Sequence, residues 1–159
     1  MRRTIEGPDD LTVRSASRSP VPAAPGIQAA DISLMVDRFY DAIRRDERLG
    51  PLFDGVIEDR WPAHLNRMKA FWRSVLLRTG EYHGRPVPAH NGIADLRSSD
   101  FERWIALFDA TTNEIFEPQA AIVIQSAARR VGSSLWLARF GSPFNSPPEA
   151  LQGGGAYRG

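Results

Sequence analysis

Residues 61–90 read WPAHLNRMKAFWRSVLLRTGEYHGRPVPAH and hold all three histidines of the chain. From residue 62 to about residue 78 the apolar residues recur at helical spacing. One stripe of this predicted helix carries residues separated by four, three and four positions: His64, Met68, Phe71 and Val75. A histidine at the head of an apolar stripe needs a polar partner, which can be a backbone group, a water, a metal or a ligand.

His90 is the counterpart of His64 in this stretch. It lies 26 residues further on, beyond a bend rich in Gly and Pro, so the chain can pass under a flat ligand such as haem and return on the other side. Haem iron accepts a neutral imidazole nitrogen that is oriented through its other ring N–H. The alternatives are a surface-loop histidine at 90 and a hydrogen-bonded core histidine at 64. His83, beside Gly84 in the bend, is expected to be exposed.

The amino-acid composition limits the classes of protein to which the chain can belong. The 159 residues suffice for one domain that buries enough apolar surface to fold alone. The absence of cysteine excludes thiolate metal sites, iron–sulfur clusters, disulfides and cysteine nucleophiles. Only short apolar runs occur and no signal block opens the chain, so we expect a cytoplasmic protein without a membrane span. A net charge of +1 with interleaved acids and bases gives no basic stripe, so no nucleic-acid partner is expected.

The chain divides into a central domain and two tails. Residues 1–30 mix Arg, Ser, Pro and Ala without a period and are expected to form a disordered tail with no share in the core. Residues 31–140 form the predicted domain. Residues 141–159 are rich in Pro, Ser and Gly and are expected to be a flexible tail that also contributes nothing to the core.

Helical periodicity dominates the central domain. The predicted apolar face of the first helix carries Ile32, Met35, Val36, Phe39, Tyr40 and Ile43, and that of the last helix carries Ala121, Ile122, Ile124, Ala128, Val131 and Leu135. Roughly four helices are predicted, with caps or first-turn residues at Asp31, Pro62, Ser99 and Pro118. A short connection is expected after residues 50–53, through Asp59. Because no strand pattern is present, the sequence predicts an all-α fold whose helices pack at large angles.

Several aromatic-rich fragments occur in a fixed order: RFY at 38–40, LGPLF at 49–53, Trp61 with His64, FWRSVLL at 71–77, TGEY at 79–82 and FERWIALF at 101–108. Over about residues 31 to 140 this order and spacing resemble the truncated haemoglobins, and within them the third group. The Gly-Gly pairs typical of the other truncated groups are absent from this span, which agrees with the third group. The resemblance implies a truncated globin fold, a shortened helical sandwich around haem b.

The family's site residues can be carried over one by one. The resemblance implies that His90 is the proximal iron ligand. It implies a ligand pocket formed by Tyr40, His64 and Trp104. It also implies haem walls that include Phe53, Met68, Phe71 and Trp72, besides His64 and Trp104.

The polar residues of this implied site have a chemical rationale. Bound dioxygen takes on negative charge, which the phenol O–H of Tyr40 and the indole N–H of Trp104 can stabilise in a dry pocket. The alternative for both is ordinary core packing. Haem propionates need cations, and Arg67 is preferred over Lys69 and Arg85 because it follows His64 by three positions.

Three functions are compatible with the sequence. The first, implied by the resemblance, is a monomeric haem protein that binds dioxygen or another diatomic ligand, as a carrier or in redox chemistry on nitric oxide or peroxide with a reductase. The second is a haem-free helical interaction module whose aromatic residues only fill the core. The third is a non-haem metal hydrolase using His64 and His90, which lacks a carboxylate close to either histidine at helical spacing. A visible absorption spectrum separates the first two.

Overall fold

The computed structural model describes residues 21–82 and 93–152. Within these ranges the chain forms six helices: α1 (Ala29–Arg45), α2 (Leu49–Ile57), α3 (Trp61–Leu77), α5 (Ser98–Ile115), α6 (Pro118–Phe140) and α7 (Glu149–Gln152). No strand occurs among the described residues, and the predicted all-α class is confirmed. None of the helices in this part of the chain is long and apolar enough to cross a bilayer.

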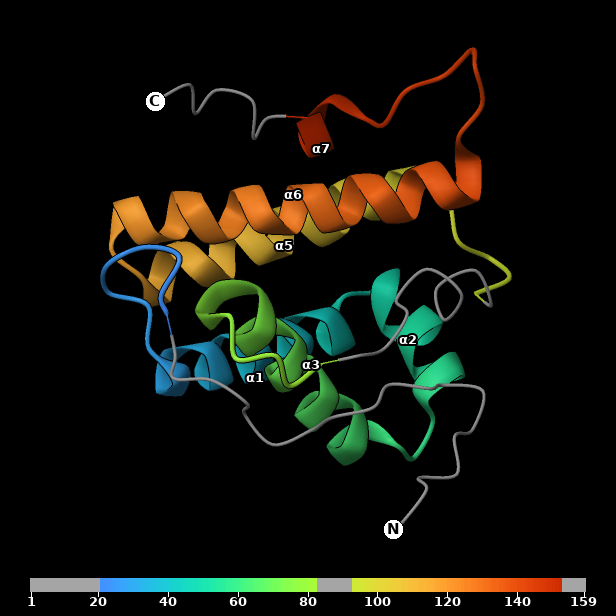
Figure 1. Cartoon of the computed structure of the whole chain (residues 1–159). Coiled ribbons are helices and arrows are strands. Elements are labelled where there is room, and N and C mark those ends of the chain that lie inside the picture. Colours follow the sequence, from blue (N-terminus) through green and yellow to red (C-terminus); the bar gives the residue numbers. More distant parts are fainter. Residues whose placement is uncertain (1–20, 83–92, 153–159) are drawn as a thin grey trace, which may run out of the picture.

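The helices form two layers. Figure 1 shows α5 and α6 as a neighbouring pair on one side of α1, α2 and α3, with α7 lying over α6. The layers meet in an aromatic core around the fully buried Phe108 of α5. Its ring stacks on Trp72 of α3 with centroids 5.1 Å apart and on Trp104 at 5.9 Å. Phe39 of α1 meets Phe108 edge-on at 5.1 Å, so one cluster joins three helices.

The predicted apolar faces decide which side of each helix is buried. The buried side chains of α1 are those of the predicted stripe: Ile32, Met35, Val36, Phe39, Tyr40 and Ile43. The predicted helix starts are less accurate. Asp31 lies in the first turn of α1 rather than at its cap, and α5 begins before Ser99, where the N–H of Arg97 donates to the Asp100 carboxylate at 2.8 Å. The start of α6 at Pro118 is confirmed.

The connection predicted after residue 53 is wrong over residues 54–57, because these residues continue α2, which spans Leu49–Ile57. The Asp46 carboxylate accepts the N–H of Arg48 at 3.0 Å and that of Leu49 at 2.8 Å. These bonds satisfy donors that a helix start leaves open. Hydrogen bonds to Leu49, Arg103 and Arg48 outweigh partial burial and hold the pKa of Asp46 below its usual range.

Two glycines of α2 provide a matched pair for testing how tightly this helix packs. A Cβ at position 50 would lie 2.6 Å from the carbonyl oxygen of Arg44, whereas a Cβ at Gly55 meets nothing within 4 Å. We expect Gly50→Ala to lower the free energy of unfolding by about 1–3 kcal/mol, because a backbone carbonyl has to move. Gly55→Ala should raise it by about 0.5–1 kcal/mol, since alanine is the better helix former.

Urea titration of the two variants and the parent protein measures both changes. Equal effects of the same sign would mean that the contact between Gly50 and Arg44 does not constrain the start of α2.

Both predicted tails contribute to the core where the structure describes them. Ile27 and Leu151 are each only 2% exposed. The N–H of Val21 donates to the carbonyl of Leu77 at 2.7 Å, and Ala23 makes the equivalent bond to Leu76 at 2.8 Å. The expectation that residues 1–30 and 141–159 take no part in the core is therefore wrong for these described segments. Single apolar residues in segments rich in Pro and Gly have no periodicity by which a sequence pattern could reveal their burial.

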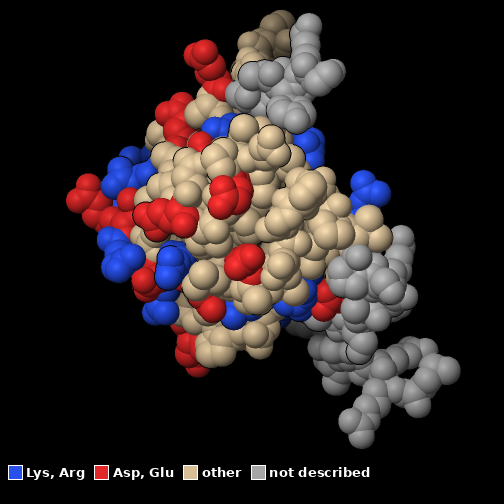
Figure 2. Space-filling model, turned by 90° about the vertical axis from the view of Figure 1, so that its left-hand side faces the viewer, with Lys and Arg blue, Asp and Glu red and all other residues tan. Residues whose placement is uncertain are grey.

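Charges of both signs are interspersed on the surface. Figure 2 shows Lys and Arg side chains beside Asp and Glu side chains over one face of the molecule. Ion pairs such as Lys69 with Asp37 at 2.9 Å and Arg45 with Asp41 at 3.2 Å neutralise one another locally. This face therefore carries no extended field of one sign.

Candidate functional site

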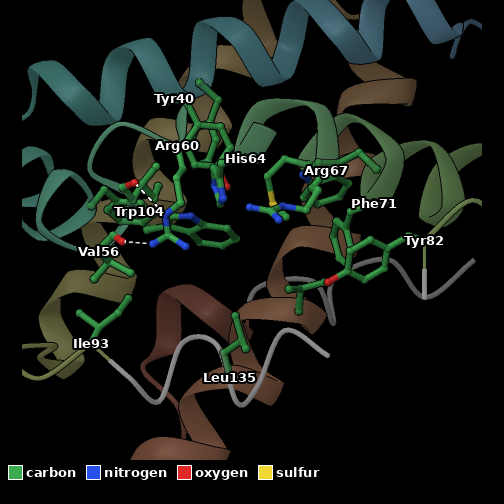
Figure 3. A pocket seen from close by; sticks show the side chains of 16 residues that line it. Tyr40, Val56, Arg60, His64, Arg67, Phe71, Tyr82, Ile93, Trp104 and Leu135 are labelled. Carbon is green, nitrogen blue, oxygen red and sulfur yellow. Dashed lines mark hydrogen bonds between the residues drawn. The ribbon is translucent and has the colours of Figure 1, made fainter. Parts of the chain in front are cut away.

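One cavity gathers the predicted site residues (Figure 3). It is bounded by α1, α2, α3, α5 and α6, and the predicted cofactor and ligand residues that the structure describes all line it: Tyr40, Phe53, His64, Arg67, Met68, Phe71, Trp72 and Trp104. His90, His83 and Arg85 lie outside the described residues. The enclosed part of the cavity measures about 100 Å³, and the empty space including its open mouth about 980 Å³.

Tyr40 and His64 form the polar side of the cavity. Their rings meet edge-on with centroids 5.2 Å apart, and Figure 3 shows both side chains pointing into the cavity from neighbouring helices. The buried Trp61 packs behind them, 5.9 Å from the Tyr40 ring and 5.7 Å from the His64 ring. Trp61 is itself fixed by a hydrogen bond from its Nε1 to the Asp54 carboxylate at 2.9 Å. Packing against Trp61 therefore holds the rings of Tyr40 and His64 in place.

Tyr40 stays protonated over the whole physiological pH range. Its side chain is buried, and burial raises the pKa of its hydroxyl far above the usual range. The electrostatic effect of Tyr82 adds to this rise. Tyr40 therefore offers the cavity a neutral phenol, which can donate a hydrogen bond to a ligand.

Trp104 adds an aromatic wall to the cavity. Its indole stacks on Phe108 with an interplanar angle of 18° and meets the edge of Phe39 at 5.8 Å. It also lines a second, smaller cavity with about 40 Å³ of enclosed space. The indole of Trp104 is thus a partition between two spaces.

Arg67 brings a positive charge to the same cavity. Its buried Nε has no hydrogen-bond acceptor among residues 21–82 and 93–152. A buried donor without an acceptor is costly, so this nitrogen suits an anionic or acceptor group on a ligand. Lys69, two positions further along α3, does not line the cavity and pairs with Asp37 at the surface instead.

Comparisons with known proteins agree with this architecture. No family model matches the chain. The group 3 truncated haemoglobin of Campylobacter jejuni is 29% identical over 110 residues, which span 67% of this chain and 87% of the relative. The crystal structure of group III truncated haemoglobin from Campylobacter jejuni matches with a TM-score of 0.68 at 25% identity and covers 77% of this chain and 98% of that chain. The chain is related to the group III truncated haemoglobins. The predicted resemblance and the truncated globin fold are thereby confirmed.

The cavity has further wall residues for which the sequence analysis predicts no role in a site. These are Phe39, Val56, Ile57, Arg60, Tyr82, Ile93, Val131 and Leu135. Three of them were expected only as core positions of their helices: Phe39, Val131 and Leu135. Tyr82 carried a signal as the last residue of the TGEY fragment, and its ring packs edge-on against Phe71 with centroids 5.0 Å apart. Val56 and Ile57 were missed because α2 itself was not predicted, whereas Phe53 of the same helix was implied by the resemblance.

Glu81 anchors the chain where α3 leads into Tyr82. Its carboxylate accepts two hydrogen bonds from Arg73, at 2.9 and 3.0 Å, and one from the Thr79 hydroxyl at 2.6 Å. The bonds from Arg73, opposed by burial and aided by Thr79, hold the pKa of the Glu81 carboxyl below its usual range. This cluster ties the end of the truncated globin's α3 to the residue that enters the cavity wall.

The lowered pKa of Glu81 predicts a dependence of stability on pH. A carboxyl whose pKa is depressed by folding stabilises fully above its unfolded pKa, and this contribution is lost as the pH falls through the folded pKa. Glu81→Gln should therefore reduce the loss of stability between neutral pH and about pH 3. Thermal unfolding across this range, with the exposed Glu102→Gln as the matched control, measures the difference. A Glu81 variant with the parental pH profile would contradict the assignment.

Proposed function

We propose that the cavity binds haem b, with His90 as the iron ligand, and that the protein binds dioxygen or another diatomic ligand. The observation that carries this proposal is the convergence of the predicted cofactor and ligand residues of the described chain on one cavity. These residues come from α1, α2, α3 and α5, so neither sequence neighbourhood nor one helical stripe explains their meeting.

Chain connectivity supports His90 as the ligand. Tyr82 and Ile93, on either side of the undescribed segment, both line the cavity. His90 precedes Ile93 by three positions, and three residues of fully extended chain span at most about 11 Å. His64 reaches the same cavity from α3, with the Tyr40 ring beside it.

The remaining residues fit the parts of a haem group. The walls formed by Phe53, Phe71 and Trp72 supply apolar surface for a flat ring and exclude water. The Nε of Arg67 suits a propionate oxygen.

When bound, haem would supply an iron coordination position for a small ligand. The chain's own residues supply the donors around it. Tyr40 keeps its proton because it is buried, and the indole N–H of Trp104 has no accessible deprotonated form. Two neutral donors favour retention of a polar ligand over rapid release. We therefore infer that dioxygen dissociates slowly. Slow dissociation suits redox chemistry with a reductase better than delivery of dioxygen. Rapid release would instead favour an oxygen carrier.

A haem titration tests the proposed function. Adding haemin to the purified haem-free protein should produce a sharp Soret band that saturates at one equivalent. The competing function, a haem-free interaction module, predicts only the spectrum of free haemin. Saturation with a shifted band supports the haem site, and its absence rejects it.

Two basic residues on α3 offer a matched pair for this titration. Arg67→Gln should weaken haem retention by about threefold to tenfold, because a hydrogen bond from the cavity to a propionate is lost. Lys69→Gln should leave retention unchanged, since Lys69 pairs with Asp37 outside the cavity. Transfer of haem to apomyoglobin measures both rates, and equal rates in the two variants would contradict the role of Arg67.

A further inference from the structure

The segment after α6 folds back over the α5 and α6 pair. Figure 1 shows α7 lying over α6, and Leu151 is one of the least exposed side chains of the molecule. The segment adds a buried apolar residue that the proposed haem site does not use directly. Leu151 lies behind the cavity wall, where it can affect a side chain of that wall.

Leu151 and Trp104 both lie close to Gly132 of α6. A Cβ built on Gly132 would lie 3.0 Å from Leu151 Cδ2 and 3.4 Å from Trp104 Cζ3. Both side chains therefore occupy the space above a residue that has no side chain of its own. Only glycine lets the leucine come this close to α6 without displacing a neighbour.

Trp104 needs support on this side. Phe108 covers one face of the indole, but the ring separates the main cavity from the smaller one, which Gly132 and Leu135 also line. A ring with empty space on two sides loses packing contacts and gains freedom to turn. Leu151 approaches the same Gly132 as the indole, so it is placed to limit this freedom.

Polar anchors hold Leu151 in register with the helices that carry Trp104 and Gly132. Arg129 of α6 donates from Nε to the carbonyl of Ala150 at 3.0 Å. The same guanidinium binds both carboxylate oxygens of Asp109 on α5, at 3.0 and 2.6 Å. The Ser133 hydroxyl donates to the carbonyl of Leu151 at 3.3 Å. The backbone of α7 is thus fixed to α5 and α6 on either side of the leucine.

We propose that Leu151 is a positioning residue for the ligand pocket, which holds the indole of Trp104 against the cavity through their contact over Gly132. The inference rests on the proposed function for its effect on ligand binding. The contact itself is a property of the protein without any ligand. Leu151, which lies beyond the end of α6, thereby limits the motion of the Trp104 side chain in the pocket.

Two readouts test the proposal on the full-length chain. The first is the ¹⁹F NMR spectrum of haem-free protein labelled with 5-fluorotryptophan, in which Trp104→Phe identifies the Trp104 resonance. Leu151→Ala should shift or broaden that resonance, and the fully exposed Phe144→Ala should not. The second is the dioxygen dissociation rate of the haem-loaded protein. Leu151→Ala should raise it by about twofold to tenfold with little change for carbon monoxide, as expected for a weakened donor.

Two more variants separate positioning from stability. Leu151→Met keeps the volume and should restore both readouts, whereas Gly132→Ala wedges the contact apart and should reproduce the effects of Leu151→Ala. A Leu151→Ala protein that is less stable but has the parental Trp104 resonance and the parental ratio of the two dissociation rates overturns the proposal. If the parent protein takes up no haem, the proposed function fails, and the NMR comparison still decides the contact.

Discussion

Replacing His90 by alanine should abolish stable haem binding. The imidazole of His90 is the iron ligand in the proposed site. Among residues 21–82 and 93–152, His64 is the one histidine that lines the cavity. Loss of the iron ligand leaves only apolar contacts and the Arg67 charge to retain the ring. Absorption spectra of the purified variant after addition of one equivalent of haemin should lack the Soret band of the parent protein.

His83→Ala is the matched control for this prediction. His83 belongs to the same stretch of sequence but stands beside Gly84, where it is expected to be exposed, so its loss should leave haem loading unchanged. His90→Gly gives a second test. Added imidazole should enter the space of the lost side chain and restore the Soret band. Normal haem loading of His90→Ala would refute the assignment of the ligand.

The parts of the fold that could be predicted are those with a long apolar period. α1, α3, α5 and α6 each repeat apolar residues over four or more turns, and each was expected from the sequence. The spacing of His64, Met68 and Phe71 already put these side chains on one stripe, and the structure brings all three to the cavity. The period of a helix therefore predicts which side chains share a site when they share a helix.

The parts that could not be predicted depend on contacts distant in sequence. α2 is short and contains Gly50 and Pro51 in its first turn. Its start is stabilised by Asp46, which is itself held by Arg103 of α5 at 2.7 Å. Leu151 is buried because Gly132, nineteen positions earlier, leaves room for it. No local pattern reports such pairings, because Asp46 and Arg103 are 57 positions apart and Gly132 and Leu151 are nineteen positions apart.

Removing the donor of Tyr40 or of Trp104 should speed dioxygen release. Tyr40→Phe and Trp104→Phe each keep the aromatic wall and delete one donor group. Loss of one hydrogen bond of about 1–2 kcal/mol raises a dissociation rate roughly tenfold. If the two donors act independently, the double variant should release dioxygen about a hundredfold faster than the parent protein. Stopped-flow replacement of dioxygen by carbon monoxide measures these rates.

Carbon monoxide is the internal control, because it is nearly neutral when bound and gains little from a donor, whereas bound dioxygen is polar. Its release should change much less in both variants, and equal acceleration of the two gases would mean that the substitutions merely loosened the packing. The edge-on contact of His64 with Tyr40 at 5.2 Å makes His64 the competing candidate. If His64 is the main donor or a sixth iron ligand, His64→Leu will produce the largest change, and the unliganded protein will show a six-coordinate low-spin spectrum. The ranking of the three variants therefore decides which side chain holds the ligand.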